Sequence, residues 1–495
     1  MEEIKKPLFT KKSIVLLLLP IVAEQFLSVT IGLADTVMVA FAGEHAVSAI
    51  SLVDSLNILL IQFLAAVATG GSVVAAQYLG GSKKEQASDT SKQLTQMILL
   101  FSLFITAVCA AFHTPLLSLI FGKVDADIME GCEIYFLLSY LSYPFIGLYN
   151  AGAALFRAVK DTKTPLLISA LMNLINIGGN AILIYGCRLG VAGAGIPSLL
   201  SRMVGAIVIF CLFQKKSNPI RISAPAKIRF DFPLIRRILG IGIPNGIEGA
   251  LFHIGKIILS SLVSGLGKAA ISANAIANAV ASLSNIPGSA IGTGLITIVG
   301  QCMGARQAQA AKKHTVRLLG VTYLCILFLN GLQFLFAPQL ISLFSLSAES
   351  TEIAIKILRP FAVANLLLWP LAFELPYTLR AAGDVKFTML VSMFSMWIFR
   401  IGCAFWFCKG LGFGVEATWV AMYVDWVCRA TFFLFRFLSG KSGVQQKIPI
   451  LQSGFFYTVR HPYHSSQRSK NLSIFLRICL PSHSISPTAT IEAIP

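Results

Sequence analysis

Charged residues are scarce in this chain, and their scarcity excludes an ordinary water-soluble domain. Only 13% of the 495 residues are charged, whereas 56% are hydrophobic, and the mean hydropathy is +0.76. A soluble domain is about one quarter charged. Apolar windows of roughly 20 residues recur along the whole chain, and each is long enough to cross a hydrocarbon core of about 30 Å. Because these windows are continuous rather than alternating, they predict an all-α integral membrane protein.

Signatures of metal sites, disulfides and catalysis are also missing. The ten cysteines form no C-x-x-C pair and no framework spacing, so they predict neither disulfides nor a metal site. No H-E-x-x-H, G-x-S-x-G, P-loop or paired-histidine pattern occurs within the apolar windows, which disfavours a membrane enzyme. The net charge of +18 fits the basic cytoplasmic loops of a membrane protein, so we expect no nucleic-acid partner.

Window length and helix-breaking residues together predict twelve membrane spans. Two of the windows are long enough to need a bend, which we expect at Gly70-Gly71 and at Pro287-Gly288. The twelve predicted spans are 14–41, 48–79, 94–121, 132–157, 165–186, 191–213, 238–263, 270–302, 316–344, 353–379, 387–408 and 412–438.

Basic residues gather in every second loop between the predicted spans. Examples are the start of the chain to Lys12, the loop with Lys83 and Lys84, and the long stretch 214–237. The intervening loops, such as 121–131, hold few. Cytoplasmic loops are enriched in Lys and Arg, so we expect a multi-pass protein of the cell (plasma or inner) membrane with both termini in the cytoplasm.

The chain repeats itself after about 224 positions. Each half holds six predicted spans, so the halves have the same orientation and form parallel repeats related by an axis along the membrane normal. We expect a binding site between them, near the middle of the membrane. The matching segments are Pro20–Glu24 with Pro244–Glu248, 75–87 with 298–310, 156–163 with 379–386, and 190–195 with 414–419.

This repeat predicts four parts of the chain. Residues 1–213 form an N-lobe of six membrane helices, residues 214–237 a cytoplasmic linker, and residues 238–438 a C-lobe of six more. The stretch 439–495 is polar, bears Ser, Pro and His, and lacks a long apolar window. Such a composition predicts a disordered tail.

Two acids interrupt the first predicted span. Glu24 and Asp35 are eleven positions apart, so they fall on one face of a helix with about 3.6 residues per turn. An ionised carboxylate is costly in hydrocarbon, and acids within membrane helices tend to mark an ion or substrate path. The alternative for Asp35 is a position near the membrane surface, where water solvates it.

Several motifs recur in order through both halves. They are ADTVMVAFAG (34–43), AAQYLGG with its repeat GQCMGA, RAVKDTKTP with RAAGDVKFT, NIGGNAILIYG (176–186), and GVAGAG followed by SR (201–202). Together they resemble the multidrug and toxic compound extrusion (MATE) family over nearly the whole chain to about residue 438. The resemblance implies a monomeric antiporter, not an enzyme, that exports hydrophobic organic cations by alternating access among membrane lipids. It also implies Na⁺ or H⁺ as the coupling ion and no other cofactor.

The resemblance assigns a coupling site to the N-lobe. The family's first-helix aspartate corresponds to Asp35, its fifth-helix pair to Asn176 and Asn180, and its sixth-helix hydroxyl to Ser198. Asn180 departs from the acid common in one branch, which leaves Asp35 as the main acid of this lobe. A carboxylate and two amides offer oxygen ligands that suit a hard cation such as Na⁺. The alternative is that the amides only join helices by hydrogen bonds.

A second candidate site lies in the C-lobe. The resemblance implies acids on the seventh and tenth helices, and Glu248 and Glu374 are the nearest, although neither sits on the family's usual turn. Lys256 follows Glu248 by about two turns. Glu248 therefore either binds a cation or helps to neutralise Lys256 through a neighbouring group. Glu24 and Glu248 occupy matching repeat positions, which favours a shared structural role as much as chemistry.

Two other functions stay open at this point. A flippase of lipid-linked saccharides, as in a related branch of the superfamily, would favour a cleft lined with basic residues, and the predicted spans hold few. An integral membrane enzyme or receptor is the other alternative.

Overall fold

The computed structural model describes residues 8–122, 124–214, 218, 220, 230–344 and 346–440, except for the side chain of Leu33. The chain divides into a unit of residues 1–447 and a unit of residues 448–495, and every described residue belongs to the first. Much of the predicted linker 214–237 and nearly all of the predicted tail 439–495 lie outside the described residues. Within these residues every regular element is helical, which confirms the all-α class.

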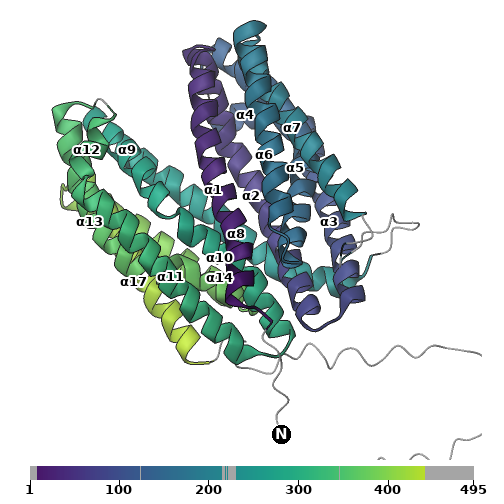
Figure 1. Ribbon diagram of the computed structural model, residues 1–495. Coiled ribbons are helices and arrows are strands. Elements are labelled where there is room, and N and C mark those ends of the chain that lie inside the picture. Colours follow the sequence, from purple (N-terminus) through teal and green to yellow (C-terminus); the bar gives the residue numbers. More distant parts are fainter. Residues whose placement is uncertain are drawn as a thin grey trace, which may run out of the picture. The chain divides into compact units, whose positions relative to one another are not determined.

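The first half of the chain forms one group of helices (Figure 1, purple to blue). Thr10 caps the first of them. Its Oγ1 accepts a hydrogen bond from Ser13 N at 3.2 Å, and Ser13 Oγ accepts one from Thr10 N at 2.8 Å, so two amides at the helix start gain partners. The elements are α1 (Lys11–Ala40), α2 (Glu44–Gly80), α3 (Lys84–Ala111), α4 (His113–Phe121), α5 (Ala126–Ala158), α6 (Lys163–Asn180), the π-helical segment η1 (Ala181–Gly186) and α7 (Gly190–Phe213).

The second half forms the other group (Figure 1, green to yellow). Asp231 caps its first helix by accepting a hydrogen bond from Leu234 N at 3.1 Å, and Pro233 stands in the first turn. Both features favour a helix start, so α8 begins at Phe232 rather than at the predicted 238. The elements are α8 (Phe232–Ser264), α9 (Lys268–Ser284), α10 (Ile286–Gly304), α11 (Ala308–Leu335), α12 (Ala337–Ser342), α13 (Ala348–Trp369), η2 (Pro370–Glu374), α14 (Leu375–Ala381), α15 (Val385–Phe394), η3 (Ser395–Gly402), α16 (Cys403–Phe405), η4 (Trp406–Gly410) and α17 (Glu416–Leu438).

Ten helical stretches of the described chain are long and apolar enough to cross a membrane. Two more, α5 and α17, have 33 and 23 residues, which is enough length for a span of about 30 Å. Tyrosine and charged side chains lower the hydropathy of both. With them, the described chain holds twelve rods in two groups of six, as the sequence predicts.

The two expected bends have different outcomes. The window 270–302 breaks at Asn285 into α9 and α10, with Pro287 in the first turn of α10, where a missing amide proton is harmless. Helix α2, in contrast, continues as one element through Gly70 and Gly71. A side chain at Gly70 would come within 2.7 Å of Gly242 N on α8, so this glycine permits close packing between the two halves.

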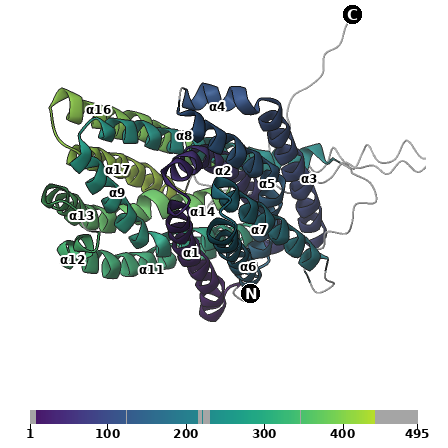
Figure 2. The same cartoon turned by 90° about the horizontal axis from the view of Figure 1, so that it is seen from above.

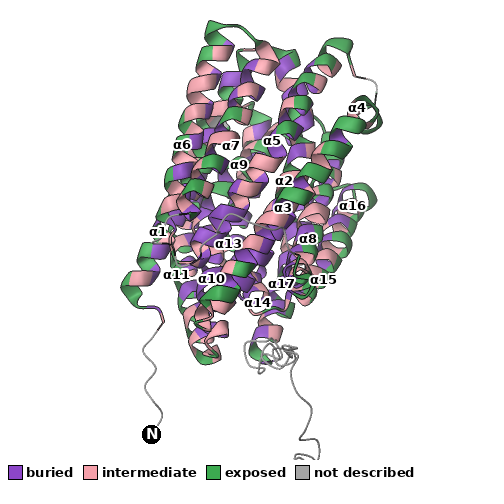
Figure 3. Cartoon of the chain, turned by 90° about the vertical axis from the view of Figure 1, so that its right-hand side faces the viewer, coloured by how far each residue is buried: buried purple, intermediate pink, exposed green. Residues whose placement is uncertain are grey.

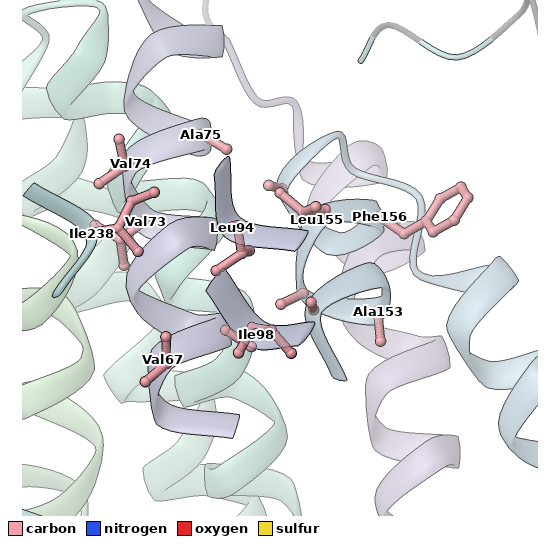
Figure 4. Packing of buried hydrophobic residues seen from close by; sticks show 14 of the residues in the cluster. Val67, Val73, Val74, Ala75, Leu94, Ile98, Ala153, Leu155, Phe156 and Ile238 are labelled. Atoms are coloured by element: carbon pink, nitrogen blue, oxygen red, sulfur yellow. The ribbon is translucent and has the colours of Figure 1, made fainter. Parts of the chain in front are cut away.

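The two groups share a core along α2. Seen from above, the helices of the first half lie chiefly on one side and those of the second half on the other (Figure 2), and α2 contacts both α8 and α10. Figure 4 shows Val67 and Val73 of α2, Leu94 of α3, Leu155 of α5 and Ile238 of α8 packed together. Inside a membrane such packing, rather than exclusion of water, holds helices together.

Many residues on the outer faces of the helices are exposed (Figure 3, green), and large apolar side chains are among them. Leu19, Phe104, Leu324 and Phe328 are 65–67% exposed. In water such a surface would be unfavourable, whereas lipid tails cover it without cost. The exposed belt therefore agrees with a multi-pass membrane protein.

Candidate functional site

Four polar side chains from three helices meet in the N-lobe. Asn180 Nδ2 on α6 donates to Asp35 Oδ1 on α1 at 3.0 Å. With its amide nitrogen facing the acid, Asn176 donates to both oxygens of Asp35 at 2.9 and 3.1 Å, and its own oxygen accepts from Ser198 Oγ on α7 at 2.9 Å. The opposite orientation would set the amide oxygen against the carboxylate. The structure thus brings the four predicted residues into one hydrogen-bonded cluster around a single acid.

Helix α6 changes its winding directly after this cluster. Its α-helical part ends at Asn180, and the chain continues as the π-helical segment η1. Wide π turns are rare and are often found at functional sites. Asn180 is 1% exposed, and its Oδ1 has no hydrogen-bond partner among the described residues. One buried oxygen therefore remains available to a cation or a water molecule.

A cavity of about 200 Å³ lies beside the cluster. Asp35 and Asn180 line it together with Asp54 of α2 and Tyr135 of α5. Two acids thus face one small space between membrane helices. Such a space attracts a cation or a proton.

Asp54 is the residue of this site that the sequence analysis missed. Its Oδ1 accepts hydrogen bonds from Tyr135 OH at 3.2 Å and from Asn57 Nδ2 at 3.0 Å. The signal that identifies Asp35, an acid within a predicted span, applies equally to Asp54 in the window 48–79. The family resemblance drew attention to the first helix and away from the second.

Two ion pairs occupy repeat-related positions. Arg157 Nη2 contacts both oxygens of Glu24 at 2.6 and 2.8 Å, and Arg380 Nη2 contacts Glu248 Oε1 at 2.6 Å. The first pair joins α1 to α5, and the second joins α8 to α14. These four side chains are only 11–20% exposed, so breaking either pair would leave a poorly solvated charge.

The structure does not bring the three C-lobe candidates together. Glu248 and Arg380 line a cavity of about 560 Å³, whereas Lys256 lines another of about 490 Å³. Glu374 is fully buried at 0% exposure, and neither of its carboxylate oxygens has a hydrogen-bond partner within the described chain. Glu248 is thus engaged by Arg380 rather than by Lys256.

The C-lobe also contains a buried ion pair within α17, formed by Asp425 and Arg429. Arg429 Nε donates to Asp425 Oδ1 at 2.8 Å, and the four-residue spacing places both side chains on one helix face. Arg400 Nη1 lies 3.7 Å from the other oxygen of the same acid. One carboxylate is therefore shared by two guanidinium groups.

The Asp35 cluster contains groups of the kind that can bind a hard cation or a proton. One carboxylate, two amides and a hydroxyl are oxygen donors of the kind that alkali and alkaline-earth ions accept. No group of three or more His, Cys, Asp or Glu side chains placed to hold a metal ion occurs in the part of the chain that the structure describes.

Comparisons with known proteins agree with this layout. A model of the MatE family matches residues 20–182 and 244–406, two segments that start 224 positions apart, as the internal repeat does. An uncharacterised transporter of Bacillus subtilis, YisQ, is 27% identical over 435 residues, which cover 86% of this chain and 93% of the relative.

A probable multidrug resistance protein NorM of Thermotoga maritima is 26% identical over 446 residues, which cover 87% of this chain and 93% of that protein. Among solved structures, the outward-facing conformation of a multidrug resistance MATE family transporter has a TM-score of 0.81 at 22% identity. The match covers 88% of this chain and 97% of the other, so the two share a fold.

Proposed function

The chain belongs to the MATE family of membrane transporters, and from this we propose that it is an ion-coupled exporter that exchanges Na⁺ or H⁺ for a small organic molecule. Its relatives are named as transporters or multidrug resistance proteins, so transport rather than catalysis is its activity. The coupling ion binds at Asp35, and no other cofactor takes part. The protein works as a monomer in the cell membrane, with both termini in the cytoplasm.

The observation that carries this proposal is the cluster around Asp35. Its donors come from α1, α6 and α7, so an ion bound there ties three helices to each other. When the ion leaves, the amides of Asn176 and Asn180 lose or change partners. An ion that binds one helix arrangement better than another shifts the equilibrium between them by that difference in affinity. This is how a gradient of the ion would drive alternating access.

A cavity of about 560 Å³ offers room for the substrate, for which the family resemblance suggests hydrophobic organic cations. Side chains of both halves line it, among them Gln62 of α2 and Trp397 of η3. Phe252 and Tyr377 add aromatic rings, and Glu248, which is paired with Arg380, lines the cavity together with Arg157 and Arg429. The aromatic faces offer stacking surfaces to a planar organic molecule.

Purified protein in liposomes tests the proposal. Vesicles are loaded with a cationic dye, and dye loss is followed under an imposed Na⁺ gradient, an imposed H⁺ gradient, or none. We expect efflux with one of the two gradients only, at a rate that rises with the size of that gradient. Equal efflux in all three conditions would contradict ion coupling, and no dye movement in any of them would contradict export of organic cations.

The orientation needs a separate measurement. In a cysteine-free background, Ala126→Cys at the start of α5 should react with an impermeant thiol reagent in intact cells. Glu85→Cys at the start of α3 should react only after permeabilisation. The reverse pattern would place both termini outside the cytoplasm.

A further inference from the structure

The cavity beside Asp35 and the cavity beside Lys256 occupy equivalent places in the two lobes. The first is lined mainly by α1, α2 and α7, and the second mainly by α8, α9 and α17, their counterparts in the repeat. Tyr135 of α5 and Asn180 of α6 complete the first lining, and Arg400 of η3 completes the second. Most positions that line the first cavity fall, after the offset of 224, on positions that line the second. Such pairs include Val39 with Val263, Val47 with Ile271, Ile50 with Asn274, and Ser198 with Met422.

The acids of the N-lobe cavity have no acidic counterparts in the C-lobe. The position of Asp35 is taken by Leu259, and that of Asp54 by Asn278. Among the described residues, no Asp or Glu lines the C-lobe cavity. The C-lobe cavity therefore lacks the groups that make its N-lobe counterpart attractive to cations.

Basic residues take their place. Lys256 stands where the N-lobe has Gly32, and Arg400 lines the same cavity. The side chain of Lys256 is exposed to the cavity, and its ammonium has no ion pair or hydrogen bond among the described residues. The Phe252 ring lies beside this ammonium, with the ring centroid 5.7 Å from Nζ. An unpaired ammonium at membrane depth is costly unless a partner is supplied.

Arg400 is only partly neutralised. Its Nη1 lies 3.7 Å from Asp425, an acid that Arg429 Nε already contacts at 2.8 Å. Arg400 Nε is buried and has no hydrogen-bond partner in the described chain. This part of the C-lobe thus holds three positively charged side chains and the one carboxylate of Asp425, which leaves it with excess positive charge. The three are Lys256, Arg400 and Arg429.

We propose that the C-lobe cavity binds the anionic group, a carboxylate or a phosphate, of an organic molecule that this protein exports. Lys256 supplies a point charge, and Arg400 a planar group of N–H donors that matches either anion. Trp419 and Met422 provide an apolar wall for the rest of the molecule. The two lobes then carry equivalent cavities of opposite charge, one for the coupling cation and one for an organic anion.

This inference rests on the proposed export function only for the fate of the molecule. Its test therefore measures binding alone. Two xanthene dyes of similar size serve as probes: carboxyfluorescein, which is anionic, and tetramethylrhodamine methyl ester, which is cationic. Binding to the full-length protein in a neutral detergent is followed by fluorescence anisotropy.

We expect carboxyfluorescein to bind the wild-type protein and to lose affinity by roughly tenfold or more in Lys256→Gln, because a charge-assisted hydrogen bond disappears. Lys409→Gln is the matched control. That lysine also lies over a phenylalanine ring, Phe405, but is outside the cavity, so its loss should leave the affinity unchanged.

Arg400 itself is not substituted, because its loss would also remove the contact with Asp425. A second variant in the cavity lining tests the charge of the cavity instead. Asn278→Asp introduces the acid that the N-lobe has at the equivalent position. This variant should weaken the binding of carboxyfluorescein and strengthen the binding of the cationic dye. Asp35→Asn should leave carboxyfluorescein binding intact even where it stops efflux, so failure of coupling and failure of this inference are distinguishable.

The proposal is overturned if carboxyfluorescein does not bind the wild-type protein, or if Lys256→Gln and Lys409→Gln bind it equally well. Nanodiscs separate two sources of the anion. If phosphatidylglycerol, compared with phosphatidylcholine alone, displaces the dye from the wild-type protein, the site accepts a lipid phosphate. If the dye stays bound in both lipids, a soluble organic anion is the occupant.

Discussion

At the scale of single residues, the candidate coupling site followed from the sequence more fully than the other sites did. Asn176 and Asn180 are four positions apart, so they had to share a helix face, and both donate to Asp35. Asp54 was not predicted, although it is also an acid within a predicted span, because the family resemblance pointed only to the acid of the first helix. The partner of Glu248 was not predicted because an acid within a span does not show which distant residue it contacts, and Arg380 is 132 positions away.

Asp35→Asn should abolish coupling without unfolding the protein. The amide is nearly isosteric, and it removes a charge that is costly in a membrane helix. It can neither take a proton nor neutralise Na⁺, so gradient-driven efflux should fall roughly ten- to a hundredfold. The measurement is dye efflux from liposomes at matched protein density, with the elution profile in detergent as the folding control. Near wild-type efflux in Asp35→Asn, with loss in Glu374→Gln, would move the coupling site to the C-lobe.

Glu24→Gln should destabilise the N-lobe because Arg157 keeps its charge and loses its partner. A fully buried pair broken on one side costs about 3–5 kcal/mol, and partial exposure here reduces this to roughly 2 kcal/mol. The double variant Glu24→Gln, Arg157→Gln should regain much of the loss, because no charge is left unpaired.

The repeat supplies the control for this pair. Glu248→Gln should lower the melting temperature in detergent by a similar amount, since Arg380 holds the equivalent bridge. If the double variant is no more stable than Glu24→Gln alone, the pair contributes nothing and the single variant acts in another way.

At the scale of helices, the apolar windows predicted which membrane helices exist and in what order, but they predicted poorly where a helix is interrupted. The window 94–121 comprises most of α3 and all of α4, which meet at Phe112. Pro115, in the first turn of α4, has no amide proton to donate back to the end of α3, so the break had a signal that the apolar window did not use. Gly70 and Gly71 suggested a bend, but α2 is uninterrupted there because these positions serve contact with α8 and Leu94. A glycine in a membrane helix has the same sequence signal whether it bends the helix or lets a neighbour approach.

Gly80 is an example of close approach that a substitution can test. A Cβ atom there would overlap the backbone oxygen of Gln301 on α10, and one at Gly304 would overlap that of Gln77 on α2. Backbone cannot give way as a side chain can, so Gly80→Ala should destabilise the protein by roughly 1–3 kcal/mol. Its melting temperature in detergent should fall.

Gly240→Ala is the control for this substitution. Gly240 lies within α8, and a Cβ atom at this position would have no heavy atom of another element within 4 Å. Because alanine is the better helix former by about 1 kcal/mol, this variant should be as stable as the wild type or more stable. Equal melting temperatures for Gly80→Ala and Gly240→Ala would contradict the prediction. They would show that α2 and α10 can move apart to accept the added methyl group with little loss of stability.

At the scale of the whole described unit, the repeat predicted more than any single motif did. Two groups of six rods, the ion pairs and the paired cavities all follow the offset of about 224. The repeat did not predict where the groups diverge in charge, because Lys256 opposite Gly32 and Leu259 opposite Asp35 are differences between the halves. The repeat therefore accounts for the shared arrangement of the helices, and its local differences give the two equivalent cavities linings of different charge.

The polar contacts between the two groups follow the same symmetry. Gln77 Nε2 on α2 donates to the carbonyl of Ala381 at 2.9 Å, and Gln301 Nε2 on α10 donates to that of Ala158 at 2.8 Å. Ala158 and Ala381 are equivalent in the repeat. Each half thus satisfies the end of a helix in the other half.

Replacing both glutamines by leucine should open this end of the molecule. A neutral hydrogen bond contributes about 1 kcal/mol. The double variant should therefore shift the equilibrium between the closed and the open arrangement of the two groups by roughly 2 kcal/mol, or about thirtyfold. Gln77→Leu alone should act more strongly than Gln301→Leu, because Gln77 Oε1 also accepts from Arg237 Nη2 at 2.7 Å.

Spin labels at Glu85 and Gln309, which are exposed and equivalent in the repeat, would report the opening as a longer distance in pulsed electron paramagnetic resonance. Gln339→Leu, an exposed glutamine on α12, is the control and should leave the distance distribution unchanged. A distribution that is the same in the double variant and the wild type would mean that packing of α2 on α10, rather than these hydrogen bonds, keeps the two groups together.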